Sequence, residues 1–269
     1  MLNNLNFPAL LAFAKTSYKK QLAYRIANWS GLFTNFVFLF IRAGVFIACY
    51  ENRDVVAGLA IIDTLTYLTL TQSFFTLMPH LGSMGLSEHI ISGQIAIELN
   101  RPLNFYLIYM AKRVGIFFYY FMFRFFPILI IGSLFGLLRL PTSFLSMPLF
   151  FLSIFLGFWI AVSIMFLIES TAFWFDSDRG LKVCMYGFFT FFSGLLIPLN
   201  YFPAWILKIT KILPFAYTFN APSQIYLGIQ TNQELLHNFI GQILWAVVLT
   251  ASCLKILSIG DKKVVLHGG

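Results

Sequence analysis

The feature that most constrains this chain is a series of six long apolar runs. A helix needs about 20 mainly apolar residues to cross the roughly 30 Å hydrocarbon core of a bilayer. Runs of this size occur at 28–50, 57–78, 114–138, 149–173, 181–199 and 235–257. A further apolar stretch at 103–111 is separated from the third run by Lys112 and Arg113. The sequence therefore predicts an all-α integral membrane protein with six transmembrane helices, forming one membrane domain over residues 1–269.

Composition supports a membrane protein and excludes a separate soluble domain. Of the 269 residues, 59% are hydrophobic and 10% are charged, with a mean hydropathy of +0.82. Soluble domains carry roughly 25% charged residues. We interpret the net charge of +8 as a determinant of membrane topology rather than as a nucleic-acid surface, so no nucleic-acid partner is expected.

The distribution of lysine and arginine predicts the orientation of the chain. If the N-terminus is inside, twelve of these cations fall in inner segments and four in outer segments. Cytosolic loops carry the excess of positive charge, so both termini are expected in the cytosol.

Residues 5–25 precede the first run and predict a helix that lies in the membrane interface, although a frayed tail is the alternative. On a helix, Lys20 would lie opposite an apolar face, and Phe13 would fall on the polar side. That apolar face would consist of Phe7, Leu11, Ala14, Tyr18 and Leu22.

Two connections between the runs are unusually long. In the inner segment 81–113, residues 87–99 predict a helix with Ile91, Ile95 and Leu99 on one side. The outer segment 199–234 is apolar and rich in proline, and we expect short re-entrant helices in the outer leaflet. Such irregular backbone is tolerated only where other parts of the protein satisfy its polar groups.

No motif indicates an enzyme. The chain has no GxxxxGK[ST], HExxH or GxSxG sequence, and its four histidines have no metal-binding spacing. We therefore expect no catalytic residue, metal or cofactor site in this chain. A membrane enzyme acting on lipids would need a polar cluster at the inner surface, and the short loop with Asp176, Asp178 and Arg179 is expected to be solvated instead. Cys49, Cys184 and Cys253 are expected to be small buried hydrophobic residues.

Four ionisable residues within the runs are candidates for a functional role, because such a residue costs about 2.5–3.5 kcal/mol at mid-membrane on insertion scales. Asp63 and Glu169 lie near the ends of runs and are expected to reach water. Arg42 and Arg124 lie nearer the centres. They are expected to pair with carboxylates, to line a polar cavity, to snorkel to the interface, or to contact a substrate.

Three segments resemble ABC-2-type exporter permeases, especially the viologen-exporter-like branch. They are KKQLAYRIANW at 19–29, ISGQIAIELNRPLNFYLIYMAKRVG at 91–115, and SGLLIPLNYFPAWILKITKILPFAYTFNAPSQIYLG at 193–228. The final Gly268-Gly269 is also similar to that branch, whereas Asn100 replaces an apolar residue that is usual before Arg-Pro.

The resemblance implies the permease subunit of an exporter in a bacterial inner membrane. Such a subunit dimerises with itself or with a sibling permease, and a separate cytosolic ATPase pair binds the ATP and Mg²⁺. The inner segment would then dock onto the ATPase as a coupling helix, with Glu88, Glu98 and Arg101 as charged contacts and Pro102 as its end. Alternatively, Glu98 and Arg101 form an i,i+3 pair within the helix.

The fifth run contains four phenylalanines, Phe188, Phe189, Phe191 and Phe192, which with Arg42 are the candidates for a substrate path. Aromatic rings would suit a hydrophobic or amphiphilic cargo, including a quaternary cation. Lipid contact or ordinary helix packing is the alternative for these rings. The alternative for the whole chain is a stand-alone carrier or channel that is not driven by ATP.

Overall fold

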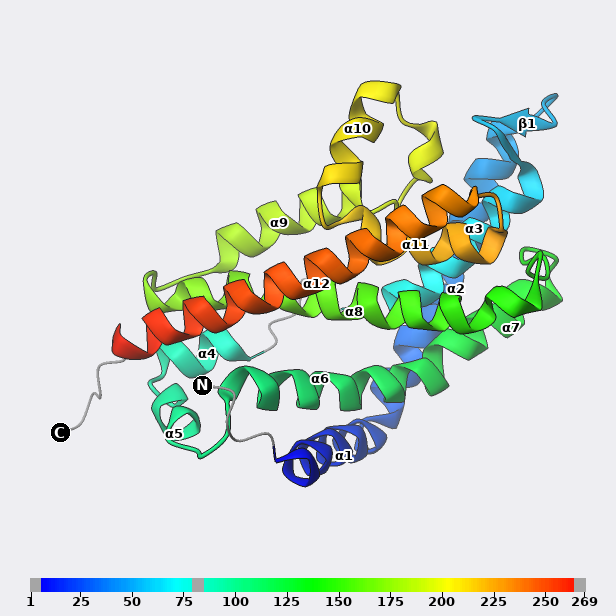
Figure 1. The fold of residues 1–269 in the computed structure, drawn as a ribbon. Coiled ribbons are helices and arrows are strands. Elements are labelled where there is room, and N and C mark those ends of the chain that lie inside the picture. Colours follow the sequence, from blue (N-terminus) through cyan, green and yellow to red (C-terminus); the bar gives the residue numbers. More distant parts are fainter. Residues whose placement is uncertain (1–5, 79–84, 264–269) are drawn as a thin grey trace.

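The computed structural model describes residues 6–78 and 85–263 and is mostly helical (Figure 1). The expectations for Leu5, for residues 81–84 of the inner segment and for Gly268-Gly269 lie outside the described residues. The elements in chain order are α1 (Phe7–Ala23), α2 (Arg25–Cys49), β1 (Val55–Val56), β2 (Leu59–Ala60), α3 (Ile61–Phe75), α4 (Leu86–Ile91), α5 (Ile95–Leu99), α6 (Phe105–Tyr120), π-helix η1 (Phe121–Phe125), α7 (Phe126–Leu134), η2 (Phe144–Ser146), α8 (Met147–Ser170), η3 (Thr171–Phe173), α9 (Arg179–Phe192), η4 (Leu199–Tyr201), α10 (Ala204–Ile212), α11 (Ala216–Leu227), α12 (Asn232–Gly260) and η5 (Asp261–Lys263).

Within the described residues, four helices are long and apolar enough to cross a membrane. They are Ile26–Cys49, Phe105–Leu134, Met147–Phe173 and Asn232–Lys263, and they correspond to four of the six predicted spans. The other two predicted spans, 57–78 and 181–199, contain α3 and α9, which are only 15 and 14 residues long. At 1.5 Å per residue such helices extend about 21–23 Å, less than the thickness of the bilayer core.

The helix that contains the third predicted span begins earlier than the sequence predicted. Lys112 and Arg113 do not separate the stretch 103–111 from it, because α6 runs through both residues without a break. The helix then widens into the π-helix η1, where the N–H of Phe126 bonds to the carbonyl of Phe121. Pro127 follows, and its missing N–H and bulky ring exclude a regular α-helical turn at this point.

The short length of α3 has a local cause in the preceding hairpin. Ala57 and Gly58 take positive φ values of 51° and 78°, which turns the chain between β1 and β2 and uses residues predicted to begin the second span. The helix that follows is buried from Thr64 to Phe74, including its threonines. Helix α3 is therefore an interior element that carries hydroxyl groups into the core.

Helix α8 lies at the centre and packs against α11 and α12. Its middle is joined to both neighbouring long helices by hydroxyl groups. The Tyr106 hydroxyl of α6 lies 2.9 Å from the Ser163 hydroxyl, and Trp159 Nε1 donates to Thr250 Oγ1 of α12 at 2.9 Å. Gln242 of α12 adds a bond to the carbonyl of Ser153 of α8 at 3.0 Å, and together these bonds fix the register of the three long helices.

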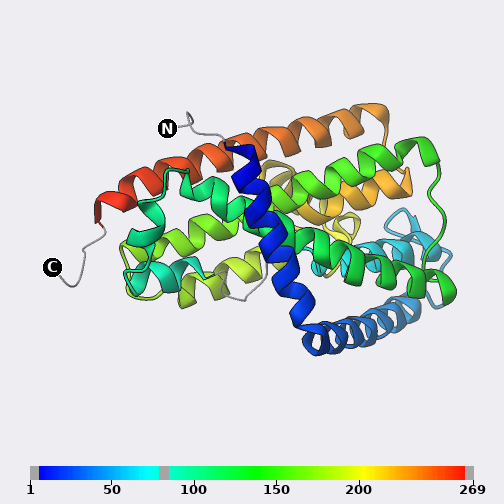
Figure 2. The same ribbon diagram turned by 90° about the horizontal axis from the view of Figure 1, so that it is seen from below.

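Helix α1 lies across α6 rather than alongside it, as Figure 2 shows from below. The crossing is so close that a Cβ atom on Gly115 would lie 2.0 Å from the carbonyl oxygen of Ala14. Of the predicted apolar face, Phe7 and Leu11 are exposed and Ala14 lies at the crossing with α6. Phe13 instead faces α6 and the adjoining loop, with the Lys112 ammonium and the Arg101 guanidinium near its ring.

Two of the three cysteines depart from expectation. Cys253 is buried, but Cys49 and Cys184 are exposed on the apolar surfaces of α2 and α9.

The α1–α6 crossing yields a stability prediction. Gly115→Ala places a methyl group where the Ala14 carbonyl lies, so α1 must move away, at a cost of about 1–3 kcal/mol. Unfolding of the purified protein in mild detergent, followed by fluorescence, measures the change. The matched control is Gly44→Ala in α2, where the new Cβ meets nothing within 4 Å and stability should be unchanged or slightly higher. Equal free energies of unfolding for the two variants would contradict the close contact between α1 and α6.

Candidate functional site

The helix break after α9 is held by polar side chains from α2 and α3. Helix α9 ends at Phe192, and the following carbonyls of Gly194, Leu195 and Leu196 have no place in a regular helix. Tyr67 of α3 donates to the Gly194 carbonyl at 2.9 Å. Arg42 of α2 donates to the carbonyls of Leu195 and Leu196. The break is thus supplied with the hydrogen bonds that lipid cannot provide.

Arg42 is anchored in turn by neutral groups of α3. Its Nη1 donates to Gln72 Oε1 at 2.9 Å, and the Gln72 amide donates to Asn35 Oδ1 at 2.8 Å. Among the described residues no carboxylate pairs with Arg42. The geometry gives Arg42 a role that was not among those expected, namely a bridge between α2, α3 and the end of α9.

The other three ionisable candidates, Asp63, Arg124 and Glu169, also have partners within the protein. Arg124 donates to Asn28 Oδ1 at 2.9 Å and lies over the Tyr120 ring, so its partners are a neutral amide and an aromatic ring. Asp63 pairs with Arg139 of the α7–α8 loop. Arg139 also donates to the carbonyl of Leu227 at 2.8 Å, which joins the start of α3 to the end of α11.

Glu169 is the clearest departure from expectation, since it is fully buried (0% exposed) instead of reaching water. Its Oε1 lies 3.2 Å from Lys182 Nζ of α9, and Lys182 Nζ lies 2.7 Å from Asp178 Oδ2. Asp178, expected to be solvated, is therefore buried as well, whereas Asp176 and Arg179 are exposed. Lys182 is surrounded by two carboxylates, which compensates the cost of burying its charge.

The same cluster holds the start of α4. The backbone N–H of Leu86 donates to Glu169 Oε2 at 3.1 Å, and Lys182 Nζ donates to Ser87 Oγ at 3.1 Å. We call Ser87, Glu169, Asp178 and Lys182 the buried charge cluster. It joins α4 to the end of α8 and the start of α9.

The predicted coupling helix 87–99 is in fact two short helices, α4 and α5. Gly93 lies between them with a φ of +75°, a conformation that breaks a helix and that glycine adopts without strain. Ile95 is buried, but Ile91 is exposed, so the predicted common face is not formed. Helix α5 ends at Leu99, shortly before Pro102.

The charged residues of this segment lie in different settings. Glu98 does not pair with Arg101; it lies 3.3 Å from Lys112 Nζ of α6 and 3.8 Å from His89 Nδ1. Glu88, Arg101 and Pro102 are exposed. The structure thus separates Glu98, which fastens α5 to α6, from two exposed charges that remain available at the surface.

The four phenylalanines of α9 do not share one face. Phe189 points inward and packs edge-on against Phe215 and Phe219 of the α10–α11 region, at ring distances of 5.9 and 5.7 Å. Phe188 and Phe191 are exposed, at 48% and 45%. Phe192 packs against both of these exposed rings. The outer surface of α9 is therefore apolar and aromatic, without the whole set lining one path.

The family is shown by comparison with protein-family models. The model described as "ABC-2 family transporter protein" matches residues 34–268, which is most of the chain. The chain belongs to the ABC-2 transporter family. It is a membrane protein whose apolar helices fit a transport permease, and members of the family typically lack an ATPase site of their own. A comparison with curated protein sequences found no match.

In this ABC-2 family protein, the buried charge cluster was missed from sequence. The available signal was a lone carboxylate at the end of one apolar run, Glu169, and a lone lysine at the start of the next, Lys182. Because consecutive runs joined by a short loop have adjacent ends, the two charges could have been paired in advance. Within the described residues, no group of three His, Cys, Asp or Glu side chains could hold a metal ion.

The cluster makes a quantitative prediction for this ABC-2 family protein. Lys182→Met leaves Glu169 and Asp178 as uncompensated buried charges and should lower the free energy of unfolding by about 3–5 kcal/mol. Adding Glu169→Gln should recover part of the loss, because one buried charge is removed. Detergent-based unfolding measures both changes.

The matched control is Lys208→Met, which removes an exposed lysine of α10 and should change stability by less than about 0.5 kcal/mol. A Lys182→Met protein as stable as the Lys208→Met protein would show that the cluster does not hold the structure.

Proposed function

We propose that this chain is the membrane subunit of an ATP-driven exporter, coupled to a separate cytosolic ATPase and paired with a second permease subunit. ATP and Mg²⁺ bind the ATPase, not this chain. The observation that carries the proposal is the buried charge cluster, because it fastens the exposed α4–α5 segment directly to two of the helices in the membrane. Within the family this segment is the natural docking point for an ATPase.

The position of α1 supports a definite placement in the bilayer. From the crossing at Gly115 to the end of α7 at Leu134 the chain has about 20 residues, enough for the hydrocarbon core. Lys112 and Arg113 lie just beyond the crossing, toward α4 and α5. Helix α1 then lies in the cytosolic interface, and the end of the molecule with α4, α5 and the last turn of α12 faces the cytosol, as the excess of inner cations requires.

Under this placement the chain crosses the membrane six times, with α3 and α9 as short crossings. Both are completed by non-helical backbone, and Tyr67 and Arg42 satisfy the carbonyls after α9. The segment with α10 and α11 re-enters from the outer side. The short crossings are possible because α3 is covered by protein and the break after α9 is hydrogen-bonded.

The exposed face of α9 is our candidate for the contact with a second permease and with the cargo. Within α9 only Lys182 and Thr190 are buried, and the exposed residues include Phe188 and Phe191. An uncharged aromatic surface suits a hydrophobic or amphiphilic cargo, and a cation could lie over a ring face. Arg42 lies behind this helix as a structural bridge, so we assign it no direct contact with the cargo.

The coupling assignment is tested by affinity purification from the native host in mild detergent. We expect a cytosolic ATPase with a phosphate-binding loop to accompany the tagged chain. Reversing the exposed charges with Glu88→Lys and Arg101→Glu should abolish its recovery while changing the free energy of unfolding by less than about 1 kcal/mol, because neither side chain is buried and the Arg101–Phe13 contact is at the surface.

The control is Lys208→Glu, an exposed charge reversal on α10 that should leave ATPase recovery intact. A crosslinked preparation that never contains an ATPase, together with flux through liposomes in the absence of nucleotide, would instead establish the stand-alone carrier.

The cargo surface is tested with the purified permease–ATPase complex in vesicles. We expect methyl viologen or tetraphenylphosphonium to be transported with ATP, and Phe188→Ala with Phe191→Ala to reduce the rate roughly tenfold, as the loss of two ring contacts of about 0.7 kcal/mol each would predict. Phe118→Ala, a similarly exposed residue of α6, is the control and should retain the rate. Equal rates in all three proteins would remove the α9 face from the substrate path.

A further inference from the structure

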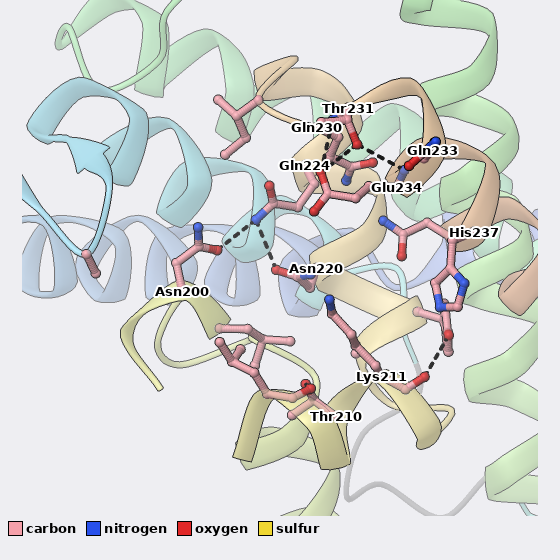
Figure 3. A pocket seen from close by; sticks show the side chains of 17 residues that line it. Asn200, Thr210, Lys211, Asn220, Gln224, Gln230, Thr231, Gln233, Glu234 and His237 are labelled. Atoms are coloured by element: carbon pink, nitrogen blue, oxygen red, sulfur yellow. Dashed lines mark hydrogen bonds between the residues drawn. The ribbon is translucent and has the colours of Figure 1, made fainter. Parts of the chain in front are cut away.

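A polar pocket lies between α10, α11 and the start of α12, away from the buried charge cluster and the exposed face of α9 (Figure 3). Its volume is about 800 Å³, within the range of pockets that hold small-molecule ligands. Six side chains with primary amides line it: Asn200, Asn220, Gln224, Gln230, Gln233 and Asn238. Asn200 and Gln233 are exposed, whereas Gln224 is buried and Gln230 is half-buried, so the covered amides need partners from the protein or from a ligand.

The amides are only partly satisfied by one another. Gln224 Nε2 donates to Asn200 Oδ1 at 3.0 Å and to Asn220 Oδ1 at 3.4 Å, as the dashed lines in Figure 3 show. Both amide atoms of Gln230 are buried and make no hydrogen bond within the described part of the chain. A buried amide without partners costs about 1–3 kcal/mol, and a ligand that both donates and accepts would recover this energy.

The charges of the pocket do not favour an anion or a cation. Lys211 approaches from α10 and Glu234 from the start of α12, so the lining carries one charge of each sign (Figure 3). The start of α12 would ordinarily attract an anion. Here Glu234 already supplies the negative charge, because its Oε2 accepts from the backbone N–H and the hydroxyl of Thr231 at 2.9 and 3.1 Å.

We infer that this pocket binds a neutral, polyhydroxylated ligand, namely a sugar or the sugar headgroup of a lipid. A hydroxyl group both donates and accepts hydrogen bonds, and an amide side chain donates from its nitrogen and accepts at its oxygen. Two neighbouring hydroxyls of a sugar can therefore bond to the nitrogen and the oxygen of one amide. Gln230, whose amide is covered in the ligand-free protein, turns toward the ligand to make the central contact, and Asn200, Asn220 and Gln224 supply further donors and acceptors. Binding requires only the purified chain, so it does not depend on the proposed coupling to an ATPase.

The test uses the protein purified in octaethylene glycol monododecyl ether, because maltoside detergents carry the proposed ligand group. The probes are maltose, monoglucosyl dioleoylglycerol, dioleoylglycerol and inorganic phosphate, and native mass spectrometry and thermal unfolding measure binding. We expect maltose or the glucosyl lipid to bind and to raise the unfolding temperature, and dioleoylglycerol and phosphate to have no effect. Binding of maltose identifies a soluble sugar, whereas binding of the glucosyl lipid alone identifies a headgroup.

The decisive variant is Gln230→Met, which removes the unpartnered amide at similar volume. It should weaken sugar binding roughly tenfold and leave the ligand-free protein at least as stable as the native one. Gln21→Met in α1, a half-buried glutamine far along the chain from the pocket, is the control and should bind the sugar normally. Binding of phosphate alone, binding of no probe, or equal sugar binding by Gln230→Met would each overturn the inference.

Discussion

The rest of the structure depends on the hydrogen bonds that Tyr67 and Arg42 donate to the carbonyls of Gly194, Leu195 and Leu196. A helix that ends inside a membrane leaves carbonyl groups that lipid cannot satisfy, and each costs several kcal/mol. Only donors from neighbouring helices remove this cost. Because Arg42 reaches the break from α2 and Tyr67 reaches it from α3, these helices and the end of α9 must keep fixed relative positions.

This requirement explains the unusual character of α3. A helix that supplies donors to a break and an amide to an arginine must be polar, and a polar helix cannot face lipid. Helix α3 accordingly carries Tyr67 and Gln72 and is buried from Thr64 to Phe74. Its threonines bond within the helix, to loop backbone or to side chains of neighbouring elements; Thr66, for example, accepts from the N–H of Arg139 at 2.9 Å, and Thr71 accepts from Arg42. Its position in the interior therefore permits a length too short to span the bilayer unaided.

The sequence predicted the features that depend on composition and missed those that depend on pairing between distant residues. The apolar runs located α2, α6–α7, α8 and α12, because burial in lipid needs only length and hydropathy. The same criterion overestimated the lengths of α3 and α9, because hydropathy does not distinguish an apolar helix from apolar turns and extended chain. At the candidate sites, Glu88 and Arg101 lie at the surface, and their role in docking stays a prediction. The partners of Arg42 could not be read from the sequence, because the carbonyls that it binds lie in the break after α9, up to 154 residues away. Glu98 likewise pairs with Lys112 of α6 and not with its neighbour Arg101.

Helix α9 is fixed by polar contacts at its two ends and makes few such contacts between them. This arrangement affects how coupling would work. At one end Lys182 joins it to Glu169 and to α4, and at the other Arg42 and Tyr67 hold the carbonyls that follow it. Most of its outer surface, including Phe188 and Phe191, is exposed. Under the proposed function, a displacement of α4 is transmitted to α9 through Lys182 and Glu169. This charge pair lies in a water-poor environment, where the attraction between opposite charges is strong. The hydrogen-bonded far end then serves as the fixed point about which α9 tilts, so that displacement of the docking segment changes the aromatic face without breaking the helix.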